Sequence, residues 1–61
     1  MRYKKYYITR TFDIGENEGG VFCEVYLAND TLFDERIDSF SVPKDIEDVE
    51  GYIKNWINKN L

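Results

Sequence analysis

The sequence predicts an α+β fold, in which a three-stranded antiparallel β-meander is followed by one C-terminal helix packed on one face of the sheet (β-β-β-α). Residues 3–40 contain segments rich in aromatic and β-branched residues, separated by loop-forming stretches. Residues 43–61 instead carry apolar residues at three- and four-residue steps, which is typical of a helix with one buried face. No repeat or linker interrupts the 61 residues, so we expect one small domain over residues 1–61.

The three strands are predicted from composition and from the loops between them. The first covers residues 3–12, where tyrosine, isoleucine, threonine and phenylalanine predominate. Residues 13–20 contain glycine, asparagine and acidic residues and are predicted to form a loop. A second strand is predicted over residues 21–28. A three-residue connection at 29–31 leads to the third strand, over 32–40.

The alternation of apolar side chains predicts the register of the first hairpin. Pairing Phe12 with Val21 gathers apolar residues on one face of the sheet, whereas a slip by one residue would scatter them over both faces. The pairs that follow are Arg10 with Cys23, Ile8 with Val25, Tyr7 with Tyr26 and Tyr6 with Leu27.

The register of the third strand follows from the short connection that precedes it. This connection predicts Leu27 opposite Phe33 and Cys23 opposite Ile37, which extends the same apolar face. The pairing also points Glu35 toward the helix, and a β-bulge in the third strand would relieve that placement.

The predicted helix begins at Pro43, because the first helical turn needs no N–H donor from its residues. Acidic residues come early in this segment and Lys54 and Lys59 come late, in the order that the helix dipole favours. Gly51 lowers helix propensity and is predicted to mark a close approach of the helix to the sheet. The apolar stripe predicted to cover the sheet consists of Ile46, Val49, Ile53, Trp56, Ile57 and Leu61.

The residue inventory argues against catalysis. The chain has no histidine and one cysteine, so it lacks the usual general base, cannot form an internal disulfide and has no cysteine-based zinc site. Cys23 alternates in step with Val21 and Val25, which indicates a buried structural thiol. We therefore expect a non-enzymatic protein without catalytic residues, a cofactor or a metal.

Charge is distributed unevenly along the chain, whose net charge is −4. Residues 1–12 hold four basic and no acidic residues, whereas residues 13–50 hold all twelve acidic residues and only two basic ones. The acidic block would repel a polyanion, so nucleic-acid binding is not the expected function. It remains the alternative, through the basic first strand with Arg2, Lys4, Lys5 and Arg10.

The sheet face turned away from the helix is the predicted contact surface. Aromatic residues and arginine are favoured in protein interfaces, and an uncovered cluster of them indicates a contact site. The candidate partner-binding residues on this face are Tyr7, Phe22, Tyr26, Leu32 and Arg36, with Glu24 placed opposite Arg36.

These observations predict a small interaction protein that binds a protein partner through the open sheet face or the acidic loops. Self-association through the open face, as a structural subunit, is the other alternative. No apolar run is long enough to cross a membrane and no signal peptide is evident, so the expected location is the cytoplasm.

Overall fold

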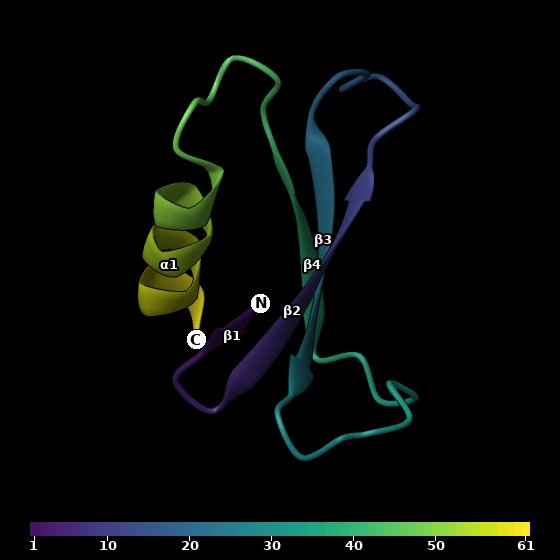
Figure 1. Ribbon diagram of the computed structural model, residues 1–61, viewed down its shortest axis with the longest axis vertical. Helices are drawn as coiled ribbons and strands as arrows, with labels where there is room; N and C mark the ends of the chain where they lie inside the picture. The colour runs from purple at the N-terminus through teal and green to yellow at the C-terminus, as the bar shows by residue number, and fades with distance from the viewer.

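The computed structural model describes all 61 residues, as a four-stranded antiparallel sheet with one helix against one of its faces (Figure 1). Neighbours along the chain are neighbours in the sheet, whose order is β1-β2-β3-β4. The predicted α+β meander with a C-terminal helix is therefore confirmed, with one short strand added at its start. The elements are β1 (Arg2–Tyr3), β2 (Tyr6–Phe12), β3 (Val21–Leu27), β4 (Asp38–Val42) and α1 (Val49–Asn60).

The register predicted for the first hairpin is confirmed along its whole length. β2 and β3 pair with Phe12 opposite Val21 at one end and Tyr6 opposite Leu27 at the other. The same antiparallel pairing continues into the loop, where the N–H of Asp13 donates to the carbonyl of Gly20. The hydrophobic pattern alone was sufficient here, because one face of these two strands packs against the helix.

A tight turn divides the predicted first strand and creates β1. Lys4 has a φ of 56°, and the chain reverses so that Tyr3 lies opposite Tyr6. The N-terminal ammonium of Met1 then donates to the carbonyl of Ile8 at 2.9 Å. The sequence did not predict this turn, because a Lys-Lys dipeptide contains none of the residues that usually adopt a positive φ.

The predicted third strand was wrong in both bounds and register. Instead of residues 32–40, the strand is β4, and Cys23 lies opposite Phe40 rather than Ile37. The register differs from the predicted one by three residues, an odd shift that exchanges the two faces of the strand.

A long loop, 28–37, replaces the predicted three-residue connection after Leu27. Its first turn is closed by the N–H of Asp30, which donates to the carbonyl of Leu27. The next turn is closed by the carbonyl of Asp30, which accepts from the N–H of Phe33, and the Asp30 carboxylate accepts from the N–H of Glu35. The pairing of Leu27 with Phe33 is therefore absent. This arrangement leaves Glu35 exposed and turns the apolar Val42 toward the helix, which avoids burying a charge.

The helix begins later than predicted. α1 starts at Val49, after an N-cap at Asp48 whose carboxylate accepts from the N–H of Gly51 at 3.0 Å. Pro43 lies well before the helix, in a turn that its carbonyl closes with the N–H of Ile46. A Cβ on Gly51 would overlap the Asp48 carboxylate, so this glycine makes room for the cap rather than for the sheet.

The core lies between α1 and the central strands. The rings of Phe40 and Trp56 pack against this core and stack on each other, with their centroids 4.1 Å apart. The helix covers only part of the sheet face, so Phe12 at the far end of β2 is 90% exposed although it shares this face with Ile8. The buried core side chains are those of Tyr6, Ile8, Cys23, Val25, Val42, Ile53 and Ile57.

Candidate protein-binding surfaces

The open sheet face is partly covered by the loop 28–37. Phe33 turns back from this loop with a φ of 52° and places its ring 5.2 Å from that of Tyr26 and 5.5 Å from that of Tyr7. Tyr26 is consequently only 7% exposed, and Tyr7 is 36% exposed. The sequence had assigned Phe33 to the helix side, so it missed the residue that covers this part of the face.

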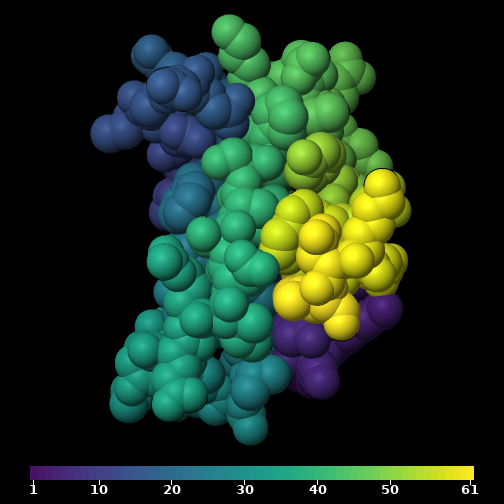
Figure 2. Space-filling view, turned by 180° about the vertical axis from the view of Figure 1, so that it is seen from behind, coloured from purple at the N-terminus to yellow at the C-terminus, as the bar shows by residue number.

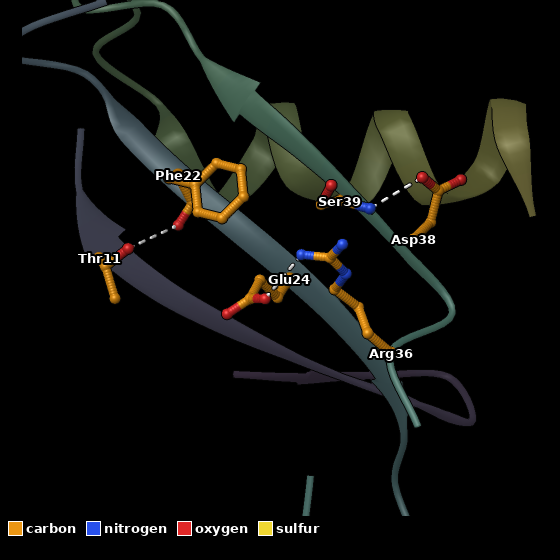
Figure 3. Close-up of polar contacts among 6 residues, drawn as sticks. All are labelled: Thr11, Phe22, Glu24, Arg36, Asp38 and Ser39. Atoms are coloured by element: carbon orange, nitrogen blue, oxygen red, sulfur yellow. Dashed lines mark hydrogen bonds and ion pairs between the residues drawn. The ribbon is translucent and has the colours of Figure 1, made fainter. Parts of the chain in front are cut away.

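The other predicted contact residues do not join into one apolar surface. Phe22 is half-buried, and Leu32 projects from the loop with 79% of its surface exposed. Arg36 forms the predicted ion pair with Glu24, at 3.0 Å, although it reaches across from the loop (Figure 3). The residue opposite Glu24 in the sheet is Ser39, because of the shifted register. Tyr7 and Tyr26 pair across strands as predicted, under the Phe33 ring.

Two acidic segments meet at one end of the molecule, which we call the acidic end: the loop 13–20 and the connection 43–48. The side-chain amide of Asn17 donates to the carbonyl of Val42 at 2.9 Å and links the two. Figure 2 shows both segments at the same end of the long axis. Lys44 is their only basic residue. Their carboxylates belong to Asp13, Glu16, Glu18, Asp45, Glu47 and Asp48.

Two large apolar side chains are exposed beside these carboxylates. Phe12 ends β2 with 90% of its surface exposed, and Ile14 begins the loop with 89% exposed. They are the two most exposed of the large hydrophobic residues in the chain. Sequence reasoning missed both, because Phe12 alternates correctly for the core and Ile14 is a single apolar residue among loop formers.

The opposite end of the molecule is basic around the β1–β2 turn. Lys4 donates to the side-chain oxygen of Asn58 on α1 at 2.6 Å, and the Nζ atoms of Lys4 and Lys54 both lie within 5.6 Å of the Tyr3 ring centre. An open cleft of about 380 Å³ lies between this turn and the end of α1. Arg10, the fourth basic residue of the predicted strand, lies far along β2 and away from this group.

The one thiol of the chain, that of Cys23, is buried in the interior. Burial raises the pKa of the Cys23 thiol, and the positive charges of Arg10 and the N-terminus oppose this only in part. No three histidine, cysteine or acidic side chains lie close enough to hold a metal ion. No helix has the length and hydrophobicity needed to cross a lipid bilayer.

No protein-family model matches this chain, and neither the curated proteins nor the solved structures include a significantly similar one.

Proposed function

We propose that this chain is a small protein-binding module, whose contact surface is the acidic end together with Phe12 and Ile14. The proposal rests on the exposure of these two side chains, 90% and 89%, in a chain that buries only nine of its 61 residues. Large apolar side chains surrounded by charged ones are typical of the anchors that dominate interface energies.

The charge of this surface limits its partner to a basic protein. Six carboxylates and one lysine come from the two segments of the acidic end. A positive surface would be steered toward them, whereas the phosphates of a nucleic acid would be repelled. We therefore favour a protein partner over nucleic acid. The open sheet face supports self-association less well, since Phe33 already covers Tyr26.

We further propose that the protein acts by binding rather than by catalysis. Its one buried thiol, Cys23, belongs to the core cluster, and the chain contains no histidine that could activate it. The exposed carboxylates of the acidic end lie in an open surface, where water competes with any substrate.

Affinity capture from the cells that make this protein tests the binding proposal. The tagged wild-type chain is compared with the double variant Phe12→Thr, Ile14→Thr, in which threonine keeps strand propensity while removing the apolar anchors. We expect a partner with a basic surface to be recovered by the wild-type chain and lost by the double variant.

The matched control is Leu32→Thr, because Leu32 is a similarly exposed apolar residue, at 79%, on the loop at the other end of the molecule. This variant should recover as much partner as the wild-type chain. Equal recovery by all three proteins would reject the acidic end as the contact surface.

A further inference from the structure

The two edges of the sheet differ in how their backbone groups are occupied. In an antiparallel sheet, successive residues of an edge strand direct their N–H and C=O groups alternately toward the neighbouring strand and outward. On β4 the outward groups include those of Ser39. The N–H of Ser39 donates to the carboxylate of Asp38 at 2.8 Å (Figure 3). A charged side chain thus occupies a donor that another strand would need.

The other edge is covered over only half of its length. β1 pairs with β2 only at Tyr6 and Tyr7, and the next outward position, Ile8, exchanges both of its backbone hydrogen bonds with Met1. By the same alternation, Arg10 and Phe12 direct their N–H and C=O groups outward, where the sheet has no further strand. Figure 1 shows that no element lies beside this part of β2 on the side away from β3.

The side chains along the open half of β2 suit an added strand. Arg10 and Phe12 are both exposed, on the sheet face that α1 does not reach at this end. A strand placed beside them would bring its own side chains next to the Phe12 ring, and cross-strand contacts with aromatic residues stabilise a sheet. Arg10 is the charged residue along this edge, so the added strand would place an uncharged or acidic residue beside it. Its basic residues would lie beyond Phe12, next to the acidic loop that follows.

We propose that β2 accepts an extended, basic segment of the partner protein as an additional strand along Arg10–Phe12, in line with β1. This inference rests on the proposed function and specifies how the partner is held: backbone hydrogen bonds supply the alignment, and Phe12, Ile14 and the carboxylates supply the selectivity. A second copy of this chain suits the edge less well, because each copy carries a net charge of −4.

Amide hydrogen exchange of the free protein, followed by NMR, tests whether the edge is open. The amides of Thr9 and Thr11 belong to the β2–β3 ladder, whereas those of Arg10 and Phe12 point outward. We expect the outward pair to exchange at least about tenfold faster than the ladder pair. Equal protection of all four would overturn the proposal, since it would mean that the edge is already occupied.

A pair of substitutions at one position then separates backbone from side-chain recognition, with a synthetic peptide as the probe, in which a valine- and threonine-rich strand segment is flanked by lysines. Arg10→Pro removes an outward N–H without breaking the β2–β3 ladder, because proline is tolerated where an edge N–H faces solvent. Arg10→Thr removes the same side chain but keeps the N–H. We expect the proline variant to bind about tenfold more weakly than the threonine variant, the loss expected for a broken hydrogen bond and a blocked edge.

The outcomes distinguish the two proposals. If Phe12→Thr, Ile14→Thr loses the captured partner while Arg10→Pro and Arg10→Thr bind the peptide equally, the acidic end binds its partner but not by strand addition. If no variant of the acidic end affects capture, the proposed function itself fails, and the strand addition with it. Thermal melting of both Arg10 variants verifies that each is folded.

Discussion

Phe33 shows how one side chain changes the accessible surface of a small domain. Its ring covers Tyr26 and contacts Tyr7, so Tyr26 is shielded from water although it lies on the sheet face away from the helix. The sequence could not reveal this contact, because Phe33 lies in a loop and no periodicity relates it to the strand residues that it covers.

Replacing Phe33 by alanine should therefore destabilise the fold, although Phe33 itself is 45% exposed. We expect a loss of about 1–2 kcal/mol in the free energy of unfolding, from two aromatic contacts and the uncovered Tyr26 ring. Urea denaturation measures it. Leu32→Ala, at the neighbouring exposed position, should change stability by no more than about 0.5 kcal/mol. Equal effects of the two substitutions would contradict the covering role of Phe33.

Cys23 gives the fold a specific dependence on alkaline pH. Burial raises the pKa of its thiol above the ordinary value of 9.0, so the unfolded chain loses this proton at a lower pH than the folded one. The stabilisation is fully present below the unfolded pKa, and it is lost as the pH rises from there through the folded pKa.

Urea midpoints measured between about pH 8 and pH 10.5 should fall more steeply for the wild-type chain than for Cys23→Ala. The difference between the two slopes isolates the contribution of the thiol, because every other side chain is the same in both proteins. Parallel curves would show that Cys23 is not protected from ionisation. The native thiol should also react slowly with alkylating reagents, because the thiolate is the reactive form.

The sequence predicts the register of one strand pair correctly and that of the next one wrongly. The β2–β3 register was predictable because apolar residues alternate in both strands and one register alone gathers them on a single face. The third strand was not, because Phe33 and Ile37 continue an apolar alternation as well as Phe40 and Val42 do. The choice between them depends on the conformation of the loop 28–37, to which local propensity gives no guide.

The sequence and the structure point to different candidate contact residues. Acidic loops were expected to contribute to binding, and the structure joins the predicted loop 13–20 to the connection 43–48, which the sequence had assigned to the helix. The aromatic residues expected on the open face are partly covered, whereas Phe12, expected in the core, is exposed because α1 is shorter than predicted. The sequence offers two possible helix starts, at Pro43 and at Val49. The helix begins at Val49, where the Asp48 carboxylate caps its first turn.

The cap of α1 predicts a non-additive pair of substitutions. Alanine normally stabilises a helix relative to glycine by roughly 0.5–1 kcal/mol, but at Gly51 the added methyl group would displace the Asp48 carboxylate. Gly51→Ala should therefore give no gain in the wild-type chain, and Asp48→Ala alone should cost about 1 kcal/mol. In the Asp48→Ala background, Gly51→Ala should recover the ordinary gain. Thermal unfolding of the four proteins provides the cycle, and additive effects would contradict the contact.

The free energy of unfolding of the whole molecule is expected to be small, because its core is small. Only nine of 61 residues are buried, and a domain of this size is typically stable by roughly 3–9 kcal/mol. Ile53 and Ile57 are the two residues of α1 that are fully buried, so they hold the helix against the sheet.

Ile53→Ala should cost about 2–5 kcal/mol, a large part of that total. Circular dichroism should show a melting temperature lower by at least about 10 °C, or no cooperative transition at all. The control is Asn55→Ala, at an exposed position of the same helix, which should leave the melting temperature nearly unchanged. A small effect of Ile53→Ala would mean that α1 contributes little to the fold.

The stack between Phe40 and Trp56 also provides an internal spectroscopic probe. Trp56 is the only tryptophan in the chain, and its ring lies against β4 rather than beside Phe33 or the acidic end. The emission of the protein therefore reports one event, the separation of α1 from the sheet. A partner that bound at the open edge of β2 would leave this emission unchanged, whereas one that displaced the helix would shift it to longer wavelength.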